Sequence, residues 1–201
     1  MTDDVGGQIE EADVALSVEA GKWRDHPVVE TLGFISEVSD QPPAFTLAGL
    51  STVAGIALGR PRLAAGGARA LASLMLATFV KGQIKKTVVR TRPYKLLEEG
   101  EYETGVGGPN HPDYNSFPSG HTADAFAAAT AVARVAPDHR GSLMAAAGFL
   151  GLIQVPRAKH HLADVVAGAL VGIAAEAVIN AAVEVAQGVA ARAAERAKER
   201  E

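Results

Sequence analysis

A stretch of 19 residues without a charged side chain, residues 41–59 (QPPAFTLAGLSTVAGIALG), places the strongest limit on how this chain folds. A helix needs about 20 apolar residues to cross the hydrocarbon core of a bilayer, so this stretch has nearly the length of a membrane span. A second apolar stretch, residues 63–80, contains one charge, Arg69, and a third, residues 141–156, contains none. These stretches predict several helices in an apolar environment.

The composition favours helices over sheets. Aromatic residues make up only 5% of the chain, whereas Ala is abundant and there are 21 Gly. Closely packed helices use such small residues, and strands prefer β-branched and aromatic ones. We therefore expect an all-α fold, a bundle of about five membrane-embedded helices. Their expected ranges are 43–59, 63–82, 119–136, 141–156 and 162–185.

The two ends of the chain differ in charge from this core. Residues 3–40 contain ten acidic residues but only two basic ones, Lys22 and Arg24. We expect a helical segment over about 8–38 that is too polar to span a membrane. The last residues, ARAAERAKERE, alternate in charge and predict a solvated helix. The expected organisation is an acidic N-terminal segment (1–41), a helical core (42–186) and a charged tail (187–201).

Composition also excludes some classes of function. The chain has no cysteine, which rules out disulfides, thiolate zinc sites, iron–sulfur clusters and a cysteine nucleophile. A net charge of −4 argues against nucleic acid as a partner. A mean hydropathy of +0.11 is low for a protein with several spans, so a soluble bundle of buried Ala-rich helices stays open as the alternative.

Three groups of polar residues stand at the ends of the apolar stretches. In the first, Lys85 and Arg92 are seven residues apart, or two helical turns, so both are expected on one face of a helix that Pro93 ends. Two cations on one face attract an anion. Such pairs are also common as interfacial anchors.

The second group is Pro118-Ser119-Gly120-His121, followed directly by an Ala-rich stretch. A hydroxyl, a closely approachable Gly amide and the positive end of a helix dipole suit an oxyanion. His121 can donate a proton to a leaving group. The alternative is an N-cap Ser with an incidental His.

The third group is His160-His161-Leu162-Ala163-Asp164. His160 and Asp164 are four residues apart, so the carboxylate can accept the imidazole N–H and make the other nitrogen more nucleophilic. A structural pair is the alternative. A metal site is disfavoured because the adjacent histidines would project in different directions and no third ligand has matching spacing.

In this order and spacing, the three groups resemble the signature of the type 2 phosphatidic acid phosphatase superfamily over roughly residues 43–185. The resemblance implies a helical protein that, in the membrane branch, removes phosphate from lipid phosphates or diphosphates without a metal or other cofactor. It implies that His160 attacks phosphorus to give a phosphohistidine, that Asp164 orients it and that His121 protonates the leaving oxygen. Lys85, Arg92, Ser119 and the Gly120 amide would hold the phosphoryl oxygens.

One position departs from that signature. The family normally carries an Arg six residues before the nucleophilic His, and Gln154 stands there. Arg157, three residues before His160, is the candidate to replace that cation. We expect Pro156 to end the fourth helix, so that Arg157 lies in the turn that follows. In the alternative, Arg157 and Lys159 anchor the loop at lipid head groups and Gln154 donates one neutral hydrogen bond.

The expected function is therefore an integral-membrane phosphatase for an isoprenoid or glycerolipid phosphate. Two alternatives remain: an impaired member that only binds a lipid phosphate or assembles with membrane proteins, and a soluble acid phosphatase of the same superfamily.

The motifs fall at one end of the expected helices, and most other basic residues fall at the opposite end. These residues are Arg60, Arg62, Arg134, Arg140, Arg192, Arg196, Lys198 and Arg200. Cytoplasmic loops carry an excess of Lys and Arg, so the chain is expected in the cell membrane with its active site facing outward.

Overall fold

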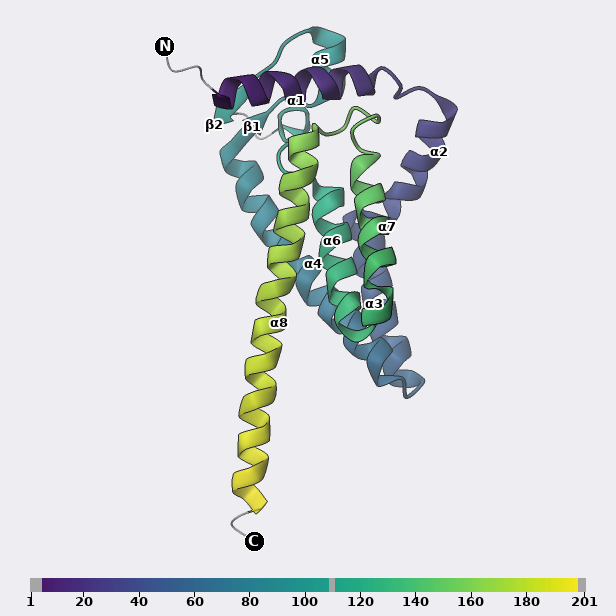
Figure 1. Ribbon diagram of the computed structural model, residues 1–201, viewed down its shortest axis with the longest axis vertical. Helices are drawn as coiled ribbons and strands as arrows, with labels where there is room; N and C mark the ends of the chain where they lie inside the picture. The colour runs from purple at the N-terminus through teal and green to yellow at the C-terminus, as the bar shows by residue number, and fades with distance from the viewer. Residues whose placement is uncertain (1–4, 109–110, 199–201) are drawn as a thin grey trace.

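The chain folds as a helical bundle, seen in a computed structural model that describes residues 5–108 and 111–198. Five helices run alongside one another down the length of the molecule (Figure 1). They are α3 (Gln41–Ala57), α4 (Pro61–Thr87), α6 (Gly120–Val135), α7 (Arg140–Leu152) and α8 (Leu162–Lys198). The all-α fold class is thus confirmed, and the five expected ranges each match a helix.

The N-terminal segment forms two helices where one helical stretch was expected. α1 (Val5–Gly21) lies across one end of the bundle, and α2 (Pro27–Ser36) descends beside it into a 3₁₀ turn, Glu37–Ser39 (Figure 1). The break comes where His26 caps α2, accepting the Val28 N–H at 3.2 Å, with Pro27 at the first helical position. Proline suits that position because its missing N–H would have no partner there.

Small residues let the bundle helices approach closely. The core joins α3, α4, α6 and α8 and is built largely from alanine, with Leu74 fully buried among Ala70, Ala77, Ala127 and Ala131. At Gly172 of α8, an added Cβ would lie only 2.3 Å from the carbonyl oxygen of Ala123 in α6. Backbone-to-backbone contact of this kind explains the low aromatic content.

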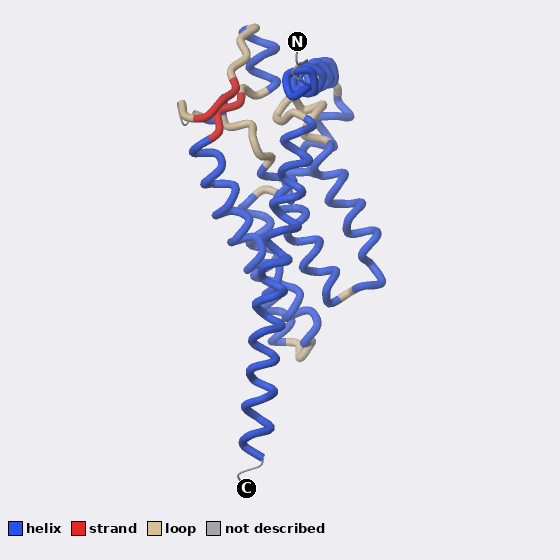
Figure 2. Tube along the Cα trace, turned by 60° about the vertical axis from the view of Figure 1, so that its left-hand side comes forward, coloured by secondary structure: helices blue, strands red, loops and turns tan. Residues whose placement is uncertain are grey.

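The segment between α4 and α6 contains the only strands among the described residues. β1 (Val88–Arg90) pairs antiparallel with β2 (Thr104–Val106), Val88 opposite Val106, on either side of a short helix, α5 (Pro93–Glu99). Figure 2 shows this ribbon at the end of the bundle near α1.

This ribbon overturns the expectation that Lys85 and Arg92 share one helix face. α4 ends at Thr87, and Arg92 follows β1 at the N-cap position of α5, with Pro93 beginning that helix rather than ending α4. Consecutive β-branched residues from Thr87 onward favour a strand, and a residue before proline is disfavoured in the helical region.

The helix α7 also ends earlier than expected, at Leu152 and not at Pro156. Pro156 has no N–H to donate to the Leu152 carbonyl, so the helical hydrogen-bond pattern cannot continue past it. The chain instead turns tightly, and the Gln154 carbonyl accepts the N–H groups of Lys159 (3.1 Å) and His160 (3.3 Å).

Within the described part of the chain, two helices, α4 and α8, are long and apolar enough to cross a membrane. α3, α6 and α7 have 17, 16 and 13 residues, so at about 1.5 Å per residue they are shorter than the ~30 Å hydrocarbon core. Five membrane-embedded helices thus remain a prediction. α8 continues without a break through the expected boundary at 186–187 and into the tail, of which residues 199–201 lie outside the described range.

The substitution Gly172→Ala should lower the thermal unfolding temperature in detergent and destabilise the fold by about 1–3 kcal/mol, because the new methyl group forces α6 and α8 apart. Gly148→Ala in α7 is the matched control, since a Cβ there meets nothing within 4 Å. Equal unfolding temperatures for the two variants would contradict a close backbone contact between α6 and α8.

Candidate active site

A cavity of about 730 Å³ opens where α4 ends and α6 and α8 begin. It brings together residues from all three polar groups recognised in the sequence. Six of the eight predicted site residues line it: Lys85, Arg92, Gly120, His121, Arg157 and His160. The other two, Ser119 and Asp164, are buried beside it and do not line it.

His160 is almost completely buried at the wall of this cavity. Its Nδ1 lies 3.7 Å from the Asp164 carboxylate, an ion-pair distance that is longer than a hydrogen bond. Burial lowers the pKa of His160 to about 3, and the positive charges of Arg92 and Lys85 act in the same direction against the effect of Asp164. The imidazole is therefore neutral at pH 7, with a nitrogen lone pair available to an electrophile.

The adjacent His161 has a different environment. Its Nε2 lies 2.9 Å from the Thr91 carbonyl oxygen, and the ring packs edge-on against Tyr102. The two histidines thus face different surroundings, as their adjacency in sequence predicted.

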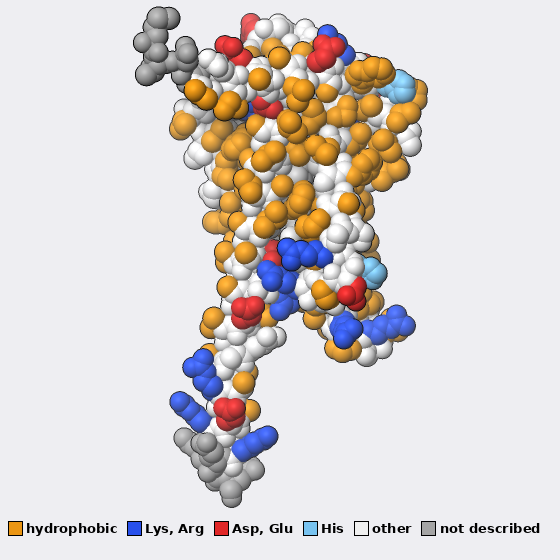
Figure 3. Space-filling view, viewed as in Figure 1, with side chains coloured by type: hydrophobic (Ala, Val, Ile, Leu, Met, Phe, Trp, Pro, Cys, Tyr) orange, Lys and Arg blue, Asp and Glu red, His pale blue; other side chains and the backbone are white. Residues whose placement is uncertain are grey.

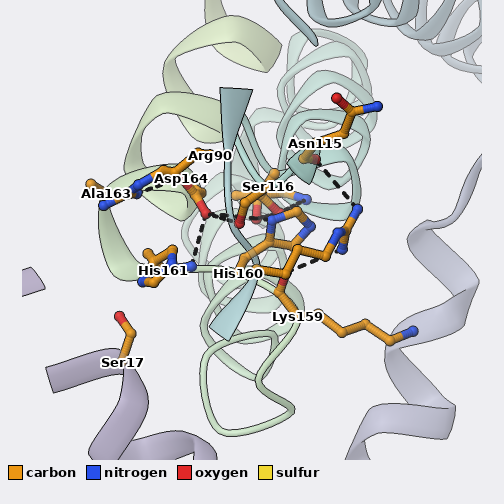
Figure 4. Close-up of polar contacts among 12 residues, drawn as sticks. Ser17, Arg90, Asn115, Ser116, Lys159, His160, His161, Ala163 and Asp164 are labelled. Atoms are coloured by element: carbon orange, nitrogen blue, oxygen red, sulfur yellow. Dashed lines mark hydrogen bonds and ion pairs between the residues drawn. The ribbon is translucent and has the colours of Figure 1, made fainter. Parts of the chain in front are cut away.

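The Asp164 carboxylate is held by three donors. It accepts hydrogen bonds from the Ser116 hydroxyl (2.5 Å), the His161 backbone N–H (2.8 Å) and the Arg90 guanidinium (2.6 Å). Figure 4 shows Asp164 between Ser116 and His161, with His160 alongside. These contacts fix the first turn of α8 next to the cavity.

Lys85 and Arg92 reach the cavity from different elements, and both donate hydrogen bonds to carbonyl groups of the loop before α6. Lys85 Nζ donates to the Asn115 carbonyl at 2.6 Å. Arg92 donates to the carbonyls of Pro112 (2.8 Å) and Lys159 (3.1 Å). The cationic pair inferred from sequence is present, although strand β1 and not a helix sets its geometry.

The first residues of α6, Gly120 and His121, form another part of the cavity wall. Ser119 is the N-cap of α6, and the hydroxyl accepts hydrogen bonds from the Thr122 hydroxyl (2.8 Å) and N–H (3.4 Å). One turn further on, Asp124 forms a buried ion pair with Lys81, whose Nζ also lies 3.5 Å from the Gly120 carbonyl oxygen. The capping role of Ser119 is the alternative that sequence reasoning left open, and its contact with phosphate stays a prediction.

Arg157 lines the cavity, whereas Gln154 is fully buried away from it. The Gln154 side-chain amide donates to the Ser36 hydroxyl (3.0 Å) and the Leu150 carbonyl (3.0 Å). Arg157 donates to Ser36 (2.9 Å), to Gln154 Oε1 (3.1 Å) and to Glu37 (2.5 Å). Gly33 leaves room for this arginine, because an added Cβ would lie 2.6 Å from its Nε.

Sequence reasoning missed Glu37, which joins this site from the N-terminal segment. Its carboxylate contacts Arg157 Nη2 (2.5 Å), Lys159 Nζ (3.3 Å) and His121 Nε2 (3.3 Å). Burial acts to raise the pKa of Glu37, but the hydrogen bond from Arg157 and the charge of Lys159 outweigh it and lower the pKa to about 2. Glu37 is therefore ionised at pH 7.

Glu37, Asp40 and His121 each place one potential ligand atom within 4.8 Å of the others. A metal cation there would compete with Arg157 and Lys159, which already neutralise Glu37. The charges of Arg157 and Lys159 thus oppose a divalent ion at this cluster.

Arg90 is the second contribution that no sequence pattern indicated. This buried arginine pairs with Asp164 and also with two acidic residues of α1, Glu10 (3.0 Å) and Asp13 (2.6 Å). The excess of acids in the N-terminal segment was visible in the sequence, but their partner was not.

These features define an all-α protein with a cationic, histidine-containing pocket at one end of a helical bundle. The family model described as PAP2 superfamily matches residues 66–187, and the chain belongs to that superfamily.

The chain is also similar in sequence to individual curated proteins, over part of its length. The chain is 30% identical over 107 residues to a lipid A 1-phosphatase of Rhizobium etli, covering 53% of this chain and 45% of that one. It is 35% identical over 82 residues to a lipid A 1-phosphatase of Porphyromonas gingivalis, covering 39% and 18%. The chain therefore spans less than half the length of these relatives.

Among solved structures, the crystal structure of Aquifex aeolicus LpxE superposes with a TM-score of 0.59. The sequence identity is 20%, and the match covers 82% of this chain and 92% of that one. This likeness establishes a shared fold.

The substitution Arg90→Gln should destabilise the fold by about 3–5 kcal/mol, because it leaves the buried Asp164 charge without its cationic partner. Arg24→Gln, which breaks the partly exposed pair with Glu98, should cost less than about 1 kcal/mol. Chemical unfolding in detergent measures both values. A loss at Arg90 no larger than that at Arg24 would contradict the central role given to this ion pair.

Proposed function

We propose that this protein is a membrane phosphatase that removes phosphate from a lipid phosphate or diphosphate through a phosphohistidine. The observation that carries the proposal is the neutral, buried His160 in one cavity with Lys85, Arg92 and His121. A nucleophilic nitrogen, two cations for phosphoryl oxygens and a proton donor are the groups that such a reaction requires.

The reaction has two steps. The free ring nitrogen of His160 bonds to phosphorus while the bond from phosphorus to the lipid oxygen breaks, and His121 gives that oxygen a proton. Water then attacks the phosphohistidine, passes a proton to His121 and releases inorganic phosphate. Lys85, Arg92 and the Gly120 amide stabilise the charge on the phosphoryl oxygens in both steps.

The relatives named lipid A 1-phosphatase support a phosphorylated lipid as the substrate class. A lipid phosphate also fits the exterior of the bundle, where Figure 3 shows apolar side chains over much of the face between the two charged ends. Leu50, Ile56, Phe79 and Leu170 are each more than 60% exposed, as expected of helices that face lipid.

The orientation follows from the charges. Lys and Arg gather at the end of the bundle opposite α1 and along the tail (Figure 3), and Arg60, Arg62 and Arg140 lie in or beside the connections at that end. By the positive-inside rule, that end faces the cytoplasm and the cavity opens to the periplasmic or extracellular side.

Purified protein should hydrolyse a generic lipid phosphate in excess EDTA and be inhibited by vanadate, which resembles the transition state at phosphorus. His160→Ala should abolish turnover, and ³²P from labelled substrate should appear on the wild-type chain as an acid-labile adduct. Binding of lipid phosphate without hydrolysis would identify the chain as a binding member of the superfamily. An absolute need for a divalent metal would refute the mechanism.

Arg157→Ala should lower kcat/KM roughly ten- to a hundredfold, the loss expected when a charge-assisted contact of ~1.5–3 kcal/mol in the transition state is removed. Gln154→Ala is the comparison, because Gln154 is buried and does not line the cavity. If Gln154→Ala lost more activity than Arg157→Ala, Arg157 would not be the replacement for the missing motif arginine.

A further inference from the structure

Glu37 contacts three side chains that line the cavity, His121, Arg157 and Lys159, but does not line it itself. It belongs to the 3₁₀ turn after α2, outside the region that matches the superfamily model. We propose that Glu37 is a positioning residue for His121, whose Nε2–H its carboxylate accepts so that Nδ1 delivers the proton to the leaving oxygen. This inference rests on the proposed phosphatase function.

The hydrogen-bond roles follow from the chemistry of the two groups. An ionised carboxylate can only accept, so the nitrogen facing it at 3.3 Å, Nε2, carries a hydrogen. The negative charge also stabilises the doubly protonated imidazolium, in which Nδ1 holds a second proton. When the bond from phosphorus to the lipid oxygen breaks, that second proton moves to the oxygen and His121 becomes neutral, with Nε2–H still directed at Glu37.

The second oxygen of Glu37 keeps this carboxylate in place. Oε1 accepts from Arg157 at 2.5 Å and from Lys159 at 3.3 Å, while Oε2 faces His121. Asp40 is the other carboxylate near His121, with an oxygen within 4.8 Å of the ring nitrogen. The two cations hold Glu37 ionised. Glu37 and Asp40 favour the charged form of His121, whereas its burial and the charge of Lys159 oppose that form.

The leaving group provides a test that a purely structural role would not pass. Glu37→Gln keeps the side chain's shape but removes its charge, so kcat for short-chain phosphatidic acid, whose alkoxide must be protonated, should fall by about tenfold or more. With p-nitrophenyl phosphate, whose nitrophenolate leaves without protonation, the loss should stay below about threefold. Glu30→Gln on the exposed face of α2 is the matched control and should equal wild type with both substrates.

A double-mutant cycle isolates the route through His121. In a His121→Ala background, Glu37→Gln should cause no further loss with phosphatidic acid, because the group that it positions is gone. Equal losses with both substrates, or a full additional loss in the His121→Ala background, would overturn the inference and assign Glu37 to Arg157 or to the fold. Wild-type kcat in Glu37→Gln would overturn it as well.

A measurement without turnover separates this inference from the proposed function. The ¹⁵N signals of His121 report the protons on its two ring nitrogens across a pH titration, and Glu37→Gln should move the midpoint of that titration to lower pH whereas Glu30→Gln should not. An unchanged midpoint would overturn the inference. Wild-type protein that hydrolyses neither substrate would refute the phosphatase activity, and the ¹⁵N result would still decide the link between Glu37 and His121.

Discussion

The buried carboxylate of Asp164 is the interaction on which the rest of the site depends. A charge without water costs several kcal/mol unless donors surround it, so the fold must bring donors to it. Ser116 comes from the loop before α6, Arg90 from strand β1, and the third donor is the backbone N–H of His161. Satisfying one carboxylate therefore brings two distant segments to the first turn of α8, and His160 is positioned by the same turn.

Small residues are the second constraint, because they set the distances between the helices that carry the site. Gly168 and Gly172 bring α8 against α6 so closely that a Cβ at either position would overlap the backbone of α6. The backbone N–H of Ser119 then donates to the Asp164 carbonyl at 2.9 Å, which joins the starts of the two helices directly. Side chains at both starts can thus face one cavity.

Local patterns in the sequence predicted the parts of this architecture that depend on neighbouring residues. Apolar stretches gave the five helices, and motif spacing gave the histidines and cations that share the cavity. The predicted placement of Arg92 on the same helix face as Lys85 was wrong, because residues 88–90 pair with residues 104–106 as strands and do not continue the helix. This pairing is a non-local contact. Glu37 and Arg90 were missed for the same reason: their partners lie 84 and 74 residues away, and no local periodicity encodes such pairs.

The contacts of the N-terminal segment bear on how the protein divides into modules. The expected domain boundary at about residue 42 suggests that the helical core could be produced without α1 and α2. Such a fragment would lose Asp13, which neutralises buried Arg90, and the Ser36 and Glu37 contacts that hold Arg157. The acidic segment thus holds two arginines of the site in place from outside the cavity, and joining this core to another N-terminal segment would transfer the site without those contacts.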